Sequence, residues 1–244
     1  MTVTVDIWTD INCPFCYLGK GRFEAALQDF DRRDDVTVVH HSFELDPTLP
    51  ADATSSVEEH IAHKYGISTD QATANERGIA AQAGELGLPY RVGGRDYGSS
   101  FDMHRLLHFA LSQGRQEALL DALYAGNFAD EAPLFGDRER LVTIAVGAGL
   151  DEPEIRAVLD DPEAFADAVR RDEQQAASMG ISGVPFFVFG GKYAVSGAQP
   201  VETFARAMQL AADEQLVPVT VDAADAGEAC GLDGCALPQD HSPR

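Results

Sequence analysis

The sequence has few cysteines and few cations for its length. Only 4 of its 244 residues are cysteine, and 18 lysines and arginines face 40 aspartates and glutamates, so the net charge is -22. Four cysteines are too few for a disulfide-stapled scaffold in a chain of this size. The excess of acid repels phosphate backbones and anionic lipid surfaces, so neither nucleic acid nor a membrane is expected as a partner.

Long hydrophobic runs and internal repeats are also missing from the sequence. No stretch approaches the ~20 apolar residues that a membrane-spanning helix needs. The N-terminus enters a strand pattern without the basic and apolar regions of a signal peptide, so we expect a cytoplasmic protein. In a reducing compartment, a close pair of cysteines is more often catalytic or metal-binding than structural.

The first 47 residues have the pattern of a strand, a helix and a second strand. Apolar and polar residues alternate over residues 3–8, which is the period of a strand. Residues 17–30 have helical spacing, and residues 36–45 are rich in the β-branched and aromatic residues typical of strands. The segment CPFC, residues 13–16, therefore falls at the turn from the first strand into the helix.

From residue 48 to residue 179 the pattern is almost wholly helical. Ser56 and Ser68 each begin a capping-box sequence, which is typical of a helix start. Asp161 followed by Pro162 predicts the start of the last helix of this segment, because aspartate suits the N-cap and proline the first turn. The segment is long enough to form a core of its own.

The remaining part of the chain predicts two more strands and a helix. Residues 184–197 contain two short apolar runs around a Gly-Gly turn, as in a β-hairpin, and residues 201–214 have helical spacing. This order predicts an α/β chain with one mixed sheet that is interrupted by helices. The expected division is a discontinuous sheet domain at residues 1–47 and 180–217, an inserted all-helical domain at 48–179, and a tail at 218–244.

Cys13 and Cys16 are the candidate chemical centre. If Cys13 lies at the N-terminus of the first helix, the unpaired backbone amides and the helix dipole favour its thiolate, which is a nucleophile. Pro14 suits the first helical turn because it has no amide proton to leave unpaired. Cys16 is then close enough to attack a mixed disulfide at Cys13 and release the partner.

A metal site and a structural disulfide are the alternatives for this pair. A Cys-x2-Cys metal site commonly needs a second pair ~15 to 20 residues further on, and none is present there. The histidines available to complete such a site are His40, His41, His60, His63, His104 and His108. Most such histidines are surface or packing residues, so no metal site is assigned. A structural disulfide would close a very small loop that barely constrains the unfolded chain.

Four segments of the chain together carry a family resemblance. They are CPFCYLGK (residues 13–20), SFELDP (42–47), SFDMHRLLHFA (100–110) and GISGVPFFVFGGKYAVSGAQ (180–199). The chain up to about Leu216 resembles the FrnE-like dithiol oxidoreductases, a branch of the DsbA-like thioredoxin superfamily. The resemblance implies a thioredoxin fold with a helical insertion and a cis peptide bond between Val184 and Pro185.

The resemblance also implies a function, that of a protein thiol–disulfide oxidoreductase, acting as oxidase, reductase or isomerase. Its redox-active disulfide would join Cys13 and Cys16, with no tightly bound cofactor. The residues implied in substrate binding are Pro14, Phe15, Val184 and Pro185. Because Phe15 is neutral where DsbA has histidine, we expect a less acidic Cys13 and a weaker oxidant. Asp10 either raises the thiol pKa or relays protons to Cys16, or it has a plain loop or capping role.

A related branch supplies a rival enzyme function. The 2-hydroxychromene-2-carboxylate isomerases and kappa-class glutathione transferases share two of these segment types, but serine replaces the first cysteine and activates glutathione. Cys13 therefore favours dithiol chemistry, with protein or small-molecule thiols and disulfides as partners and glutathione as a candidate cosubstrate. Glutathione-dependent transfer or isomerisation of small electrophiles is the alternative, and a peptide-binding or holdase module is the non-enzymatic alternative.

Cys230 and Cys235 form a second close pair, in a tail that we expect to be weakly ordered or docked. Three interpretations are open: a dithiol that exchanges with the main pair, a small disulfide that fastens the tail, or a zinc site completed by His241 and another ligand. Some FrnE-like proteins carry such a distal pair. A flexible tail raises the effective concentration of its thiols at the main site if it can reach that site.

Overall fold

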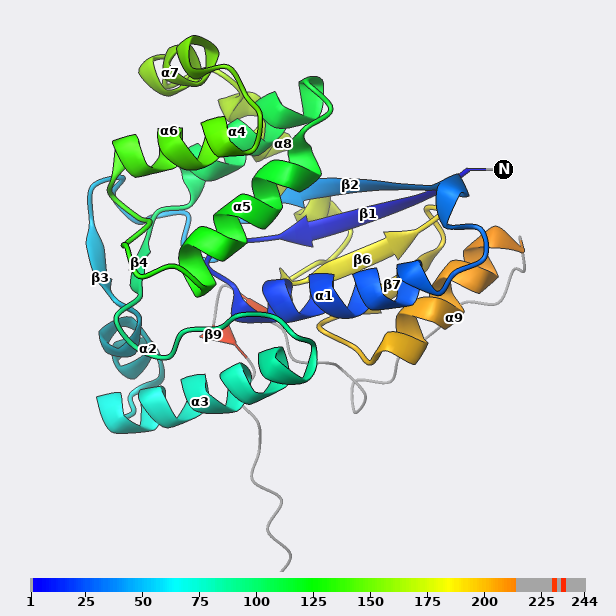
Figure 1. Cartoon of the computed structure of the whole chain (residues 1–244), viewed down its shortest axis with the longest axis horizontal. Helices are drawn as coiled ribbons and strands as arrows, with labels where there is room; N and C mark the ends of the chain where they lie inside the picture. Colours follow the sequence, from blue (N-terminus) through cyan, green and yellow to red (C-terminus); the bar gives the residue numbers. More distant parts are fainter. Residues whose placement is uncertain (1, 214–229, 232–233, 236–244) are drawn as a thin grey trace, which may run out of the picture.

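A four-stranded mixed sheet forms the centre of the molecule. A computed structural model describes residues 2–213, 230–231 and 234–235 of the chain. The strand order is β2-β1-β6-β7, with β2 parallel to β1 and with β6 antiparallel to both β1 and β7 (Figure 1). The strands are β1 (Val3–Thr9), β2 (Val36–Ser42), β6 (Phe186–Phe189) and β7 (Tyr193–Ser196).

Two helices, α1 (Pro14–Gln28) and α9 (Val201–Ala212), cover one face of this sheet. The apolar residues that alternate along β1 all point to this face, because every second side chain of a strand shares a side. Phe187 of β6 packs edge-on against Phe204 of α9, with ring centroids 4.6 Å apart, and Phe23 of α1 joins them. This aromatic core fixes α1, the helix that follows the cysteine segment, against the sheet.

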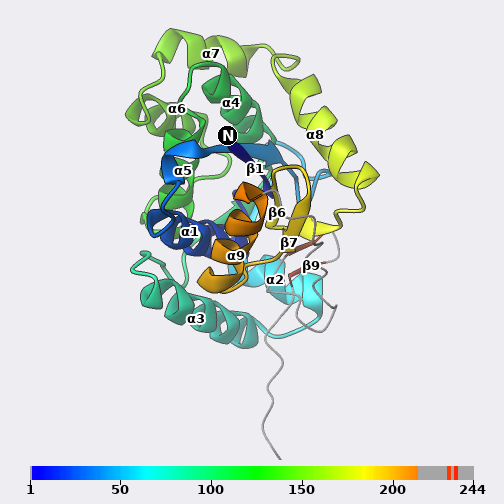
Figure 2. The ribbon, with the colours of Figure 1, turned by 90° about the vertical axis from the view of Figure 1, so that its right-hand side faces the viewer.

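The segment between β2 and β5 (Gly183–Val184) is mainly helical. Figure 2 shows α8 on the side of the sheet away from α1 and α9, and α5 next to α1. Its helices are α2 (Val57–Tyr65), α3 (Thr69–Glu85), α4 (Phe101–Ser112), α5 (Gln116–Phe128), α6 (Arg138–Gly147), α7 (Glu152–Asp160) and α8 (Ala166–Ser178). Within the described ranges, no helix is long and apolar enough to span a lipid bilayer.

The helical segment does not have a core separate from the sheet. Trp8 of β1, Val188 of β6 and Leu106 of α4 belong to one continuous cluster of buried apolar residues, which also contains Cys13 and Cys16. The division into domains at residues 47 and 179 therefore stays a prediction. The cysteine pair lies between the sheet and the helices, in contact with both.

The helical segment contains one feature that the sequence pattern missed. Two strands, β3 (Thr54–Ser56) and β4 (Asp96–Gly98), pair antiparallel within it. Strands of three residues are too short for the alternation of apolar and polar residues to reveal them. The helix starts were better predicted, since the Ser56 hydroxyl accepts the Glu59 amide and the Ser68 hydroxyl accepts the Gln71 amide, each at 3.2 Å.

The predicted start of the last helix at Pro162 is wrong, because α8 begins only at Ala166. Asp161 ends the preceding helix, with its amide bonded to the Ala157 carbonyl at 3.2 Å. Its carboxylate accepts the amide of Glu163 at 3.0 Å, which forms a local turn instead of a helix cap. Phe165 then has a positive φ of 61°, a conformation through which a helix cannot continue.

Candidate active site

Cys13 and Cys16 lie together where the chain leaves β1 and enters α1. Cys13 is the N-cap residue of α1, with φ -84° and ψ 111°, and Pro14 is at the start of the helix. The amide of Cys16 donates a hydrogen bond to Cys13 Sγ at 3.4 Å. Both thiols are free and buried. The dithiol therefore occupies the helix N-terminus, with Cys13 in the first position.

The turn around Pro185 contacts the same thiol. The Cys13 thiol donates to the carbonyl oxygen of Val184 at 3.5 Å, and the Val184-Pro185 peptide bond is cis. Pro185 also lies against α1, since a Cβ placed on Gly19 would be 2.8 Å from Pro185 Cγ. Glycine at position 19 thus allows α1 to approach this turn closely.

The Cys13 thiol is less acidic than the sequence suggests. Burial raises the pKa of Cys13 well above its usual range, its interactions with the Cys16 thiol and the charge of Asp10 raise it further, and the hydrogen bond from the Cys16 amide lowers it. Burial thus opposes the thiolate that the helix N-terminus favours, in the same direction as the less acidic Cys13 expected from Phe15. Cys13 is 0% exposed, and the loss of hydration of a charge outweighs the effect of the helix N-terminus.

A cleft of about 650 Å³ lies beside the cysteine segment. Pro14 and Phe15, the two residues between the cysteines, form part of its wall. Other lining residues are Leu45, Tyr65, Ile79 and Tyr97. The cleft is therefore largely apolar and adjoins the position where a substrate sulfur would react.

A group of buried charges lies behind the dithiol. Asp10 is 0% exposed, and its carboxylate accepts the Leu45 amide at 2.8 Å, so the loop role expected for it is observed. His104 of α4 places Nε2 3.5 Å from this carboxylate. Glu44 is also buried and pairs with Arg170 of α8 at 2.6 Å. The sequence identified Asp10 and His104 separately, and Glu44 lies in a quoted segment, but no spacing shows that the three are close together.

Several other candidate zinc-ligand histidines pair with carboxylates. The pairs are His40 with Glu117 (2.8 Å), His41 with Asp6 (2.9 Å) and Asp172 (3.0 Å), His60 with Asp46 (3.4 Å), and His108 with Asp172 (3.0 Å). These contacts give each imidazole a carboxylate partner. None of these four histidines belongs to a cluster of metal-ligand spacing in the described residues.

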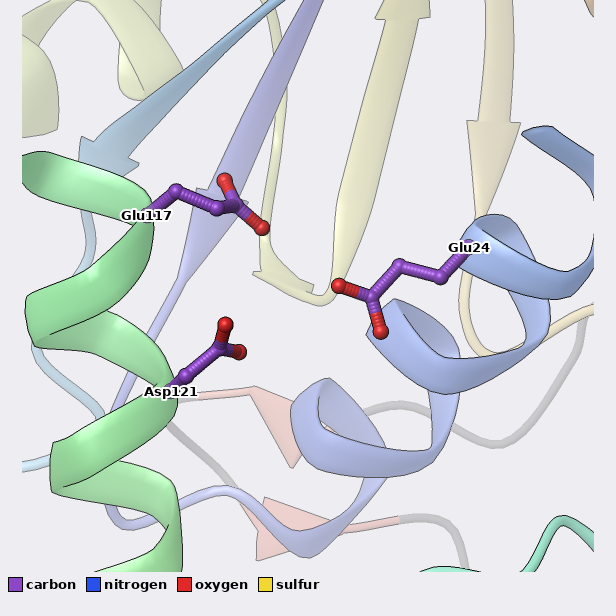
Figure 3. Close-up of side chains that lie close together, drawn as sticks. All are labelled: Glu24, Glu117 and Asp121. Carbon is purple, nitrogen blue, oxygen red and sulfur yellow. The ribbon is translucent and has the colours of Figure 1, made fainter. Parts of the chain in front are cut away.

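Three carboxylates converge between α1 and α5, those of Glu24, Glu117 and Asp121 (Figure 3). Spacing of this kind can hold a metal ion, but the ammonium group of Lys20 forms ion pairs with all three. Burial alone would lower the pKa of Lys20, but the three carboxylates raise it above its usual range. The cluster is thus an ion network that already contains its cation and joins the active-site helix to α5.

Replacing Lys20 with methionine is expected to lower the free energy of unfolding at pH 7 by about 1 to 2 kcal/mol, because the three carboxylates then repel one another. The effect is limited because those carboxylates are 40% to 57% exposed. Urea denaturation measures it, with Lys20→Arg as the control that keeps the charge. Equal stability of Lys20→Met and the unmodified protein would contradict the structural role of this network.

A mixed sheet with two cysteines at the start of its first helix, interrupted by helices, defines a thioredoxin-like α/β protein. The chain belongs to the DSBA-like thioredoxin domain family, which matches residues 4–209. This confirms the DsbA-like resemblance and the predicted fold class. The roles of the individual site residues stay predictions.

One solved structure is similar to this chain over nearly its whole length. The chain is 56% identical to the probable DsbA oxidoreductase SCO1869 from Streptomyces coelicolor, with 97% of this chain and 100% of that one covered and a TM-score of 0.85. Two more distant proteins share the fold. They are a 2-hydroxychromene-2-carboxylate isomerase (18% identity, 86% and 97% covered, TM-score 0.61) and the cytosolic disulfide reductase DsbM from Pseudomonas aeruginosa with GSH (15% identity, 87% and 97% covered, TM-score 0.56).

Proposed function

We propose that the protein is a thiol–disulfide oxidoreductase with Cys13 as the attacking thiol and Cys16 as the resolving thiol. The observation that carries this proposal is the pair of free thiols at the N-terminus of α1, with Cys13 Sγ 3.5 Å from the Val184 carbonyl. The Cys13 thiol lies beside the short strand β5, with which a substrate segment could pair. The oxidoreductases of the same family support this chemistry.

In the reductive direction, the Cys13 thiolate attacks one sulfur of a substrate disulfide. The substrate S–S bond breaks, a Cys13–substrate disulfide forms, and the released thiolate takes up a proton. Cys16, after losing its proton, attacks Cys13 Sγ and releases the second substrate thiol. The dithiol has then lost two electrons to the substrate, and the reverse sequence oxidises a substrate dithiol.

The environment of Cys13 bears on the direction of the reaction. A low thiol pKa stabilises the reduced form of a dithiol and makes its disulfide a strong oxidant. Burial does the opposite here, because it raises the pKa of Cys13. We therefore propose reduction or isomerisation of disulfides, in preference to strong oxidation, as the activity in the cytoplasm where we expect the protein to act.

Part of the tail backbone, residues 230–231, pairs with β5 beside the Cys13 thiol. Strand β8 (Cys230–Gly231) runs antiparallel to β5, with Cys230 opposite Val184, the residue that contacts the Cys13 thiol. Strand β9 (Gly234–Cys235) places Cys235 opposite Cys230. Figure 1 shows β9 close to the start of α1. The tail thus pairs with the strand edge that a substrate would use.

These positions favour one interpretation of the second cysteine pair. Opposed Cα atoms of an antiparallel ladder lie ~4.5 to 5.5 Å apart, which is within the span of a disulfide. We therefore propose that Cys230 and Cys235 are a second redox pair that exchanges with the first. His241, the ligand suggested for a zinc site, lies outside the described residues, as does most of the tail from 218 to 244.

A Cys16→Ser variant tests the proposal, because the chain then lacks the thiol that resolves a mixed disulfide at Cys13. We expect a stable Cys13 adduct after exposure to insulin, identified by mass spectrometry of the digested protein. The matched control adds Cys230→Ser and Cys235→Ser, which removes the tail thiols and should increase the yield of the insulin adduct. Absence of any Cys13 adduct in both variants contradicts the oxidoreductase function.

Glutathione is a second candidate partner. The apolar cleft beside Pro14 and Phe15 contains polar side chains, among them Lys64 and Asn75, that could bind the peptide groups of a small thiol. DsbM was solved with GSH, and we propose that glutathione reduces the Cys13-Cys16 disulfide here. Turnover of an electrophile with glutathione in a Cys13→Ser variant would instead favour the transferase alternative. Full function without both cysteines would favour a peptide-binding or holdase module.

A further inference from the structure

The proposed exchange steps do not use His104, although it lies directly behind the dithiol. Its side chain is 1% exposed, and neither ring nitrogen has a hydrogen-bond partner in the described part of the chain. The nearest opposite charge is the Asp10 carboxylate, 3.5 Å from Nε2. Burial of an imidazole costs stability unless a partner offsets the cost, and the Asp10 carboxylate is the partner within reach of His104.

The groups that face His104 come from three parts of the fold. Asp10 follows β1, Glu44 follows β2, and Glu173 and Arg170 belong to α8. Burial alone would lower the pKa of His104, but Asp10, Glu44 and Glu173 together raise it above its usual value. These carboxylates therefore favour the protonated form of His104, whose Nε2 lies 3.5 Å from the Asp10 carboxylate.

Asp10 connects this pair to the cysteines. It lies three residues before Cys13, and its carbonyl oxygen accepts the Cys13 amide at 3.2 Å. The negative charge of Asp10 is one of the causes that raise the pKa of the Cys13 thiol. A positive charge on His104 offsets this effect, because it neutralises the carboxylate next to the position where the thiolate forms.

The charged group formed by Asp10, His104 and Glu44 borders a cavity at Glu44. Glu44 is buried, and burial raises its pKa to about 7 against the opposing charges of His104 and Arg170. Together with Arg170, Phe101 and Asp102 it lines a cavity of about 460 Å³ on the outer side of the group. A change in the protonation of Glu44 therefore changes the electrostatic potential at His104.

We propose that His104 is a positioning residue for dithiol exchange, whose proton neutralises Asp10 behind Cys13 and thereby determines how readily the thiolate forms. This inference rests on the proposed role of Cys13 and Cys16. The acidity of the Cys13 thiol then depends on three side chains outside the cysteine segment, those of Asp10, Glu44 and His104.

The test is a pH titration of the thiolate absorbance of the reduced full-length chain with Cys230→Ser and Cys235→Ser, so that only Cys13 and Cys16 contribute. His104→Gln is expected to move the midpoint of the thiolate titration up by about one pH unit, and Asp10→Asn to move it down by a similar amount. Asparagine keeps an oxygen for the Leu45 amide. In the Asp10→Asn background, His104→Gln is expected to have no further effect, since the charge that it offsets is gone.

His108→Gln is the matched control, because His108 lies one turn further along α4 and pairs with Ser42 and Asp172 at 3.1 and 3.0 Å instead of Asp10. It should leave the titration unchanged. An unchanged titration in His104→Gln, or an equal effect with and without Asp10, would overturn the inference. The titration needs no substrate, so a failure of the proposed function would appear separately, as absence of disulfide exchange in the unmodified protein.

Discussion

Replacing Cys13 with serine is expected to slow the reduction of insulin disulfides by about a thousandfold or more, as removal of an attacking nucleophile does in other enzymes. The serine hydroxyl is not ionised near neutral pH and cannot form the mixed disulfide on which both exchange steps depend. The measurement is the rate of insulin reduction at a fixed concentration of a small thiol reductant. Circular dichroism confirms that the variant is folded.

Cys16→Ser is the informative companion to this variant. It keeps the attacking thiol, so the first attack on the substrate disulfide should proceed, and the reaction should then stop at the mixed disulfide before one turnover is complete. A Cys13→Ser protein that reduced insulin at the unmodified rate would show that the dithiol is not the reaction centre. Serine at positions 230 and 235 instead tests the tail, and should change the rate only if the second pair transfers electrons to the first.

The position of the dithiol could be predicted from the sequence because its determinants are local. A strand pattern, a proline in the first helical position and a helical run around Cys13 and Cys16 define a helix N-terminus without any distant contact. Fold class followed from the order of elements together with the segment around Val184-Pro185. The same local signals placed Ser56 and Ser68 correctly as helix caps.

The acidity of Cys13 could not be predicted in the same way. The pKa of Cys13 depends first on burial, and burial comes from segments that are distant in the chain, such as the turn at Val184, 171 residues away. The pairing of Cys230 with Val184 is also a contact between distant backbones, and the tail composition contains no strand signal for it. His104 was recognised only as a histidine at helical spacing, because its role depends on where Asp10 and Glu44 lie.

A second group of buried charges joins the helical segment to the sheet, and Asp172 of α8 is its centre. Its carboxylate accepts the amide of Ser42 at 2.8 Å and a ring N–H of His41 at 3.0 Å, and it pairs with His108 of α4 at 3.0 Å. Its backbone carbonyl accepts the indole N–H of Trp8 at 3.2 Å. One residue thus connects α8 with β1, β2 and α4.

Asp172→Asn is therefore expected to lower the free energy of unfolding at pH 6 by about 3 kcal/mol, because it leaves charged His41 without its buried partner. Burial alone would lower the pKa of His41, but Asp172 and Asp6 together raise it to about 9. The asparagine side chain keeps one acceptor oxygen, so the backbone contact with β2 can persist. The expected loss comes mainly from the missing charge.

The pH dependence of this loss distinguishes charge from packing. In the unfolded chain His41 has a pKa of about 6.5, so a folded-state value raised to about 9 gives a stabilisation that is fully present below pH 6.5 and disappears as the pH rises through 9. Urea denaturation at pH 6, 7.5 and 9.5 should show the gap between the unmodified protein and Asp172→Asn becoming smaller at each step. Asp6→Asn, which removes the more exposed partner of His41, should cause a smaller loss with the same trend. A gap that stays constant up to pH 9.5 would mean that Asp172 acts through its hydrogen-bond geometry alone, and that the charge of His41 contributes nothing to the attachment of α8.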